Sequence, residues 1–225
     1  MVSLFMTSPP STTATTTATS PVTDQHLSRA DLQRLVADAP AALQFERCTF
    51  DGEDLSQMDL RGATFIGCTF ADTALEAATL TSTRWLDCRA ARAQLQRADC
   101  TDARWHRCDL NNTDWTRARL SSALFAEVKL TGAHFREAHT LGLEFHESLL
   151  VGADLRGLSF RKQTLAQLDL SEADLGGCDF RDALFEGGSL RDAHLKNTRF
   201  DGADLRGQCL AGLATQTRTD IDFGL

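Results

Sequence analysis

The chain has 225 residues, with 31 Asp and Glu against 23 Lys and Arg, a formal net charge of −8 and a pI near 5.2. This mildly acidic balance argues against direct binding of nucleic acid, whose phosphates attract basic surfaces. No stretch approaches the roughly 20 apolar residues of a membrane-spanning helix. The cysteine count of seven is odd and no secretory signal precedes the chain, which together indicate a reduced, cytoplasmic protein.

Residues 1–22 form a tail of mostly Ser, Thr, Pro and Ala without a single charged side chain. Such a composition buries too little apolar surface to fold, so we expect this tail to be disordered.

Residues 23–42 are predicted to hold one short helix. Ser28 followed three residues later by Asp31 is typical of a helix start, and Pro40 marks the end. The apolar residues between them recur on one helical stripe: Leu32, Leu35 and Val36. We expect this helix to cover the open end of the fold that follows, because an uncovered end would expose unpaired backbone groups.

Residues 43–212 follow a strict period of five. Of the 34 positions reached by stepping from Phe45 to Leu210, all but Ala90, Cys100 and Thr140 hold Leu, Phe or Trp. The residue two places earlier is small in 26 of these repeats. A period of five fits neither a helix nor a regular strand. It predicts a small and a large residue facing one side as in a short strand, followed by three residues that turn the chain.

Turn residues stand where this scheme needs them. Asp directly precedes ten of the large positions, and Gly follows twelve of them by two residues. Both residue types are typical of turns, and Gly supplies backbone freedom. The chain is therefore expected to wind into coils that stack and together bury one continuous core.

Three segments, residues 153–157, 173–175 and 203–207, read ADLRG, ADL and ADLRG and resemble the A(D/N)LxG signature of the pentapeptide-repeat family. The resemblance covers residues 43 to about 212. It implies an all-β fold, a right-handed quadrilateral β-helix with four pentapeptides per coil, in which residues twenty apart stack. One column would then be an almost continuous aromatic ladder: Phe45, Phe65, Trp85, Trp105, Phe125, Phe145, Leu165, Phe185 and Leu205.

Some repeats depart from the family pattern because a large residue occupies the small position. These residues are Glu53, Met58, Leu143, Leu158, Gln163, Leu168 and Gln208. We expect local irregularity at these repeats, most of all between residues 138 and 168.

No catalytic, cofactor or metal site is predicted. Cysteines 48, 68, 88 and 108 would stack in a linear column, which does not offer the tetrahedral convergence of a zinc site, so they are expected to be small buried fillers. The six histidines scatter without a nucleophile placed to use them. The glycines follow the period of five and never form a phosphate-binding loop. An enzyme is not expected, and no cofactor is implied.

The candidate partner surface is a group of arginines between residues 84 and 119, where the outward positions carry a local excess of positive charge: Arg84, Arg89, Arg92, Arg97, Arg104, Arg107, Arg117 and Arg119. Residues 213–225 would cap the last coil or pair with a second copy. The candidate dimer residues in this tail alternate like a strand: Ile221, Phe223 and Leu225.

We predict a non-catalytic protein-interaction scaffold. The segment from Gly152 to Leu175 resembles pentapeptide-repeat proteins found with bacterial type VI secretion components, which implies an accessory or adaptor that holds an effector or spike component. The alternative implied by the family is a DNA mimic that binds DNA gyrase or topoisomerase, confers resistance to a gyrase inhibitor and dimerises through its C-terminal end. A purely structural protein or a host-directed effector is a third class of function.

Overall fold

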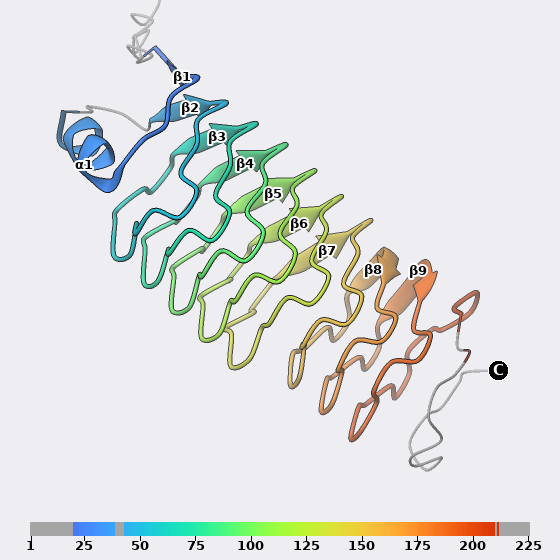
Figure 1. Cartoon of the computed structure of the whole chain (residues 1–225). Coiled ribbons are helices and arrows are strands. Elements are labelled where there is room, and N and C mark those ends of the chain that lie inside the picture. The colour runs from blue at the N-terminus through green and yellow to red at the C-terminus, as the bar shows by residue number, and fades with distance from the viewer. Residues whose placement is uncertain (1–19, 39–42, 210, 212–225) are drawn as a thin grey trace, which may run out of the picture.

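The computed structural model describes residues 20–38, 43–209 and 211. They form one short helix and a nine-stranded parallel sheet whose strands follow one another in chain order. The elements are β1 (Val22–Thr23), α1 (Arg29–Asp38), β2 (Gln44–Glu46), β3 (Thr64–Ile66), β4 (Arg84–Leu86), β5 (Arg104–His106), β6 (Leu124–Ala126), β7 (Glu144–His146), β8 (Thr164–Asp169) and β9 (Leu184–Ser189). Coils stack along one axis from the N-terminal to the C-terminal end (Figure 1).

The coils are four-sided and stack with a register of twenty residues. Strands β2–β9 form the first face, where Phe45 pairs with Phe65. The other three faces are built from single parallel bridges twenty residues apart. These begin with Thr49 and Thr69 on the second face, Asp54 and Ala74 on the third, and Asp59 and Thr79 on the fourth. The predicted quadrilateral β-helix of the pentapeptide type is confirmed.

The core is the stack of large residues that the period of five brings inside. Aromatic rings on the first face lie nearly parallel, as between Trp105 and Phe125 with centroids 4.5 Å apart. Rings from the third face meet them edge-on, as Trp115 does with Trp105 at 85°. The buried Trp115 indole donates to Thr113 Oγ1 at 2.7 Å, which satisfies its polar atom. Each such side chain contributes roughly 1.5–3 kcal/mol through burial.

The ten aspartates that precede a large residue act alike. In each, carboxylate oxygen Oδ1 accepts a hydrogen bond from the backbone N–H two residues later, as Asp54 does from Ser56 at 2.9 Å. This contact turns the chain out of the short strand at the position that the sequence predicted.

The corner residue two places after each large position adopts a left-handed backbone in most of the repeats. The eleven of these glycines that lie within the described residues all have positive φ there, but so do many residues with side chains, such as Ala77 with φ of 53°. A left-handed conformation costs a residue with a Cβ roughly 1–2 kcal/mol. The stacked coils therefore hold many corners in an unfavourable conformation.

The helix covers the first coil as predicted. The Ser28 hydroxyl donates to Asp31 Oδ2 at 2.6 Å, and the helix ends at Asp38, ahead of Pro40. Leu32 is fully buried against the core. The Arg29 guanidinium donates to the backbone oxygens of Asp54 and Ser56 at 2.7 and 2.9 Å, so it ties the helix to the first coil.

Two departures from the family pattern have a structural use. Glu53 turns outward and accepts a hydrogen bond from the backbone N–H of Arg29 at 3.1 Å, which anchors the start of α1. Leu168 fills the interior beside Gly188, its partner in the next coil. A Cβ on Gly188 would lie 2.1 Å from the backbone oxygen of Leu168, so the close approach of the two backbones requires glycine there.

The boundary of the predicted tail needs a correction. Val22 was assigned to the tail, but with Thr23 it forms β1, which pairs in parallel with Phe45 and Glu46. The strand extends the first face by one more step and covers its N-terminal edge. Residues 1–19 of the predicted tail and the C-terminal segment 213–225, including Ile221, Phe223 and Leu225, lie outside the described residues.

The hydrogen-bond ladder opens on the fourth face between the coils of β7 and β8. The predicted irregularity between residues 138 and 168 is confirmed there. In the preceding coil, Leu120 N–H donates to His139 O, whereas within the described chain Thr140 N–H has no such bond to Ser159 O. Strands β7 and β8 share only the pair His146 and Ala166, and Figure 1 shows the wider spacing. Thr140 replaces a large core residue here, so less apolar contact holds the two coils together.

The opening should be visible in amide hydrogen exchange. We expect the amides of Thr140, Gly142, Ser159 and Thr164 to exchange at least about tenfold faster than the bonded amides at equivalent positions, Leu120, Ser122, Asp179 and Leu184. Residue-resolved exchange measured by NMR provides the comparison. Equal protection of the two sets would show that the ladder is closed in solution.

A single glycine should relieve part of the corner strain. Ala77 is exposed and left-handed, so Ala77→Gly removes a cost of roughly 1–2 kcal/mol and adds roughly 0.4–1 kcal/mol of chain entropy to the unfolded state. We expect a net stabilisation of about 0.5 kcal/mol, measured by thermal unfolding. The matched control is Ala91→Gly, outside the left-handed set, which should destabilise by roughly 0.5–1 kcal/mol. A loss of stability in Ala77→Gly would contradict the strain argument.

Candidate functional site

The cysteines are interior fillers, as predicted. Cys68 and Cys88 lie one coil apart, and each thiol donates to the backbone oxygen 23 residues earlier, Phe45 O at 3.5 Å and Phe65 O at 3.4 Å. Cys100, in place of a large core residue, is fully buried, whereas Cys209 is exposed. Within residues 20–38, 43–209 and 211, no group of three or more His, Cys, Asp or Glu side chains could hold a metal ion.

The histidines are distributed over separate faces. His106 on β5 lies with Nε2 3.0 Å from Glu127 and Nδ1 2.9 Å from the Arg107 guanidinium. His134 lies on the third face, bridged to Asp114 on one side and Asp154 on the other. His106 lies in a surface network of charged side chains, whereas the bridges of His134 are formed by its backbone.

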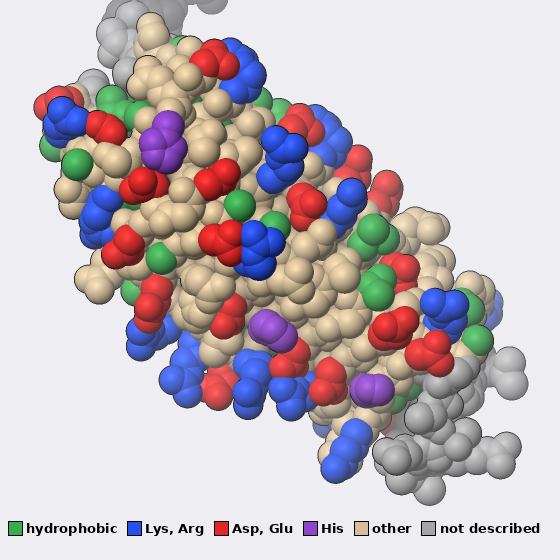
Figure 2. Space-filling view, viewed as in Figure 1, with side chains coloured by type: hydrophobic (Ala, Val, Ile, Leu, Met, Phe, Trp, Pro, Cys, Tyr) green, Lys and Arg blue, Asp and Glu red, His purple; other side chains and the backbone are tan. Residues whose placement is uncertain are grey.

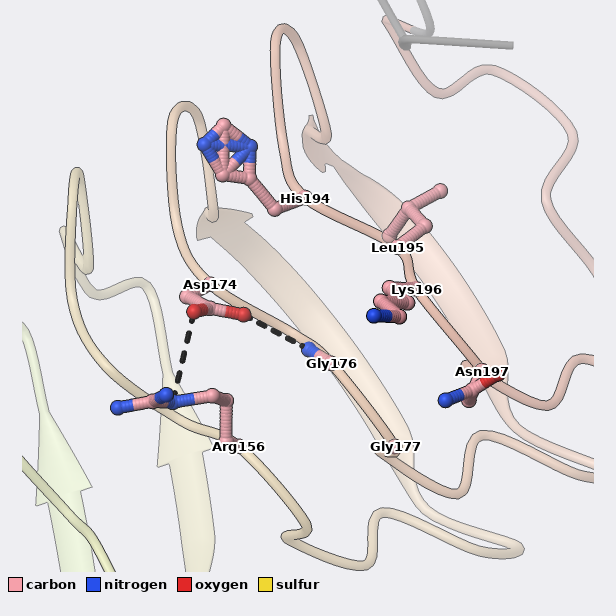
Figure 3. A pocket seen from close by; sticks show the side chains of 8 residues that line it. All are labelled: Arg156, Asp174, Gly176, Gly177, His194, Leu195, Lys196 and Asn197. Carbon is pink, nitrogen blue, oxygen red and sulfur yellow. Dashed lines mark hydrogen bonds and ion pairs between the residues drawn. The ribbon is translucent and has the colours of Figure 1, made fainter. Parts of the chain in front are cut away.

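A surface hollow of about 660 Å³ lies at the corner between the third and fourth faces near the C-terminal end (Figure 3). It exists because Gly176 stands where the neighbouring coils carry Arg156 and Lys196, and the adjacent Gly177 also lacks a side chain. Asp174 accepts from Gly176 N–H at 3.0 Å and lies 3.4 Å from Arg156 Nε. The sequence did not single out this hollow, although the adjacent glycines at one corner are a readable signal. Of the charged side chains in the lining, Arg156 and Asp174 are already engaged in these contacts.

The eight arginines of the predicted partner surface do not lie together. Arg84 and Arg104 are on the first face and Arg89 is on the second. The others occupy the fourth face or the corners, so the fold distributes the group around the whole solenoid. Five of them bind carboxylates, most of them one coil away, in the pairs Arg92–Asp72, Arg97–Glu76, Arg107–Asp87, Arg117–Glu137 and Arg119–Asp99.

Three arginines of the group, Arg84, Arg89 and Arg104, make no ion pair within the part of the chain that the structure describes.

Ion pairs with arginine also neutralise many carboxylates within a single repeat. Arg181 Nη2 lies 2.6 Å from Asp179 Oδ2, and this guanidinium holds the pKa of Asp179 at about 2. Figure 2 shows acidic and basic side chains interspersed over the visible face. The surface is therefore a mosaic and not a field of one sign.

Matches to two family models identify the family of this chain. A model described as "Pentapeptide repeat region" matches residues 42–115, and one described as "Pentapeptide repeats (8 copies)" matches residues 106–139, 144–182 and 169–207. The chain belongs to the pentapeptide-repeat family. The matches skip residues 140–143, where the hydrogen-bond ladder opens.

Solved structures of the family share the fold. A trypsin-treated QnrB1, described as a plasmid-mediated fluoroquinolone resistance protein, has 20% identity and a TM-score of 0.63 over 76% of this chain and 90% of its own. HetL, involved in heterocyst differentiation regulation in the cyanobacterium Nostoc sp. strain PCC 7120, has 19% identity and a TM-score of 0.50 over 82% of this chain and 95% of its own. No curated protein matches the chain. Within the described residues, no helix has the length and apolar character to cross a membrane.

The burial of the thiols predicts their reactivity. Burial raises the pKa of Cys178 to about 12 and raises that of Cys100 as well, so both stay protonated near neutral pH. We expect one thiol per native chain, Cys209, to react rapidly with a thiol-specific reagent, and the other six to react only on unfolding. Cys209→Ser is the control and should abolish the rapid phase. Two or more rapidly reacting thiols in the native protein would be inconsistent with this core.

Proposed function

We propose that the chain is a non-catalytic scaffold that binds another protein through its outer faces. The observation that supports this most directly is the interior, where the column of large residues is filled with side chains such as Phe125 and Trp115, both fully buried. A solenoid of this kind presents flat, ordered rows of outward side chains and holds them at a spacing of about 4.8 Å between coils. Such rows suit the recognition of a protein surface.

The gyrase-binding alternative takes its support from the likeness in fold to QnrB1, a fluoroquinolone resistance protein. A DNA mimic needs rows of carboxylates that stand in for phosphates. In this chain many such carboxylates are bound by arginines, as Asp59 is by Arg61 and Asp154 by Arg156. This pairing weakens the acidic field, so we favour the scaffold over the mimic. The type VI secretion role stays a prediction from the sequence, with no further support from the fold.

One paired experiment separates the two functions. The folded chain is immobilised and used to capture proteins from its source cells, and it is also added to a gyrase supercoiling and cleavage-protection assay. We expect reproducible capture of a protein other than gyrase, with supercoiling unchanged, because the arginines neutralise the carboxylate rows. Light scattering on the same sample gives the mass of the species tested.

The control for both arms is Phe125→Ala, which opens the core at a cost of roughly 3–5 kcal/mol and should lose capture as the faces lose their order. Inhibition of supercoiling at low micromolar concentration, or capture of gyrase, would establish the alternative. Turnover of a small molecule that depends on a described side chain would contradict both.

A further inference from the structure

The outward side of strands β3–β6 carries an unusual set of side chains. Each strand points its central aromatic residue inward and its two flanking residues outward. The result is two parallel rows on the first face, one of Thr64, Arg84, Arg104 and Leu124, the other of Ile66, Leu86, His106 and Ala126. We call these eight residues the β3–β6 platform.

Two like charges stand side by side on the platform. Arg84 and Arg104 are direct partners in the register of β4 and β5, and both are exposed. Neither makes an ion pair within the described chain, in contrast to Arg92 and Arg107, which each bind an aspartate one coil away. Like charges in register repel each other, and among the described residues no carboxylate forms an ion pair with either arginine.

Apolar side chains border the two arginines. Ile66 and Leu86 are direct partners in the second row, and Leu124 follows Arg104 in the first. The side chains of all three residues are only half-buried on this outward face of the sheet. The platform thus offers a strip of apolar surface beside two cations that have no partner.

No carboxylate belongs to the platform. The nearest acids along its rows are Glu46 on β2 and Glu144 on β7, which lie beyond its ends. Glu46 lies 3.7 Å from Arg47, and Glu144 lies 3.4 Å from His146. His106, the remaining titratable group, contacts Glu127 at the corner. None of these acids pairs with Arg84 or Arg104 within the described residues, so carboxylates of another molecule can take this place.

We propose that the β3–β6 platform binds an acidic segment of a partner protein, an inference that rests on the proposed scaffold function. Carboxylates of the segment pair with the guanidinium groups of Arg84 and Arg104, whose planar donors match a carboxylate in two-pronged geometry. A neighbouring apolar side chain of the segment covers Ile66 and Leu86. A protein segment is favoured over nucleic acid because the apolar strip has no use for phosphates and because the chain carries a net charge of −8.

The test uses synthetic peptides labelled with a fluorophore. The probe carries two Asp separated by one residue and flanked by Leu, and the comparison peptide has Lys in place of Asp. We expect the acidic peptide to bind the full chain, to weaken as salt rises, and to lose at least about tenfold in affinity for the Arg84→Glu/Arg104→Glu variant in fluorescence anisotropy. The Lys peptide should bind the wild type more weakly and gain affinity for that variant.

The matched control is Arg136→Glu/Lys162→Glu, which makes the same change in net charge with two residues that lie away from the first face and make no described ion pair. It should bind the acidic peptide nearly as well as the wild type. Both variants are checked for folding by their thermal transitions. The Arg84→Glu/Arg104→Glu variant again places two like charges in register, so its stability should stay close to that of the wild type.

Each outcome has a defined meaning. Equal loss in both variants, or no loss in either, overturns the platform while the scaffold function stands. Binding of short double-stranded DNA in preference to the acidic peptide overturns the platform and counts against the scaffold as well. No binding of the acidic peptide up to millimolar concentration overturns the platform alone, because the capture experiment judges the scaffold separately.

Discussion

The backbone hydrogen bonds between adjacent coils, which join residues 19 or 21 positions apart, are the interaction on which this structure depends. Each coil satisfies the N–H and C=O groups of the next, so the register of the first coil is copied along the solenoid. The copied register stacks Trp85 on Trp105 and Phe125 on Phe145. It also imposes a left-handed corner in most of the repeats, even at residues such as Ala77 that are strained by it.

The same ladder explains why the opening at β7 and β8 is local. Thr140 occupies a position where most repeats hold a large core residue, so one large side chain is missing from the core. Leu141 at the adjacent corner is 84% exposed. Contacts on the other faces continue between the same two coils, as Asp169 N–H does to Ser148 O and Leu155 N–H to Asp174 O. Phe160 turns toward Phe145, with ring centroids 6.2 Å apart, and keeps the interior closed. The solenoid can therefore lose one side of its ladder between two coils without losing its axis.

The outer surface follows a different rule from the core. Outward residues are free of the packing constraint, and the chain uses them largely to balance charge within a repeat or between adjacent coils, as Arg181 does with Asp179 and Arg92 with Asp72. Against this background of paired charges, Arg84 and Arg104 stand out. Most of the described arginines form an ion pair with a carboxylate, so the few that do not are informative. Neighbouring coils place a carboxylate beside an arginine, and at Arg84 and Arg104 no such ion pair is formed among the described residues.

The sequence by itself determined a solenoid of stacked coils, the aspartate turns and the glycine corners, because each depends on residues a few positions apart or on a period that repeats many times. The twenty-residue register was implied by the resemblance to the pentapeptide-repeat family, and the structure confirms it. The sequence also located the irregular region, since Thr140 and the large residues near it break the period of five. The sequence did not separate the eight arginines into those with and without partners. That outcome was decided by the stacking of coils, which placed Asp72 beside Arg92 and Asp87 beside Arg107 but set Arg84 beside Arg104. Ion pairs between coils join side chains about twenty residues apart in the sequence. The side-chain rotamers that form these ion pairs are adopted only once the coils have stacked.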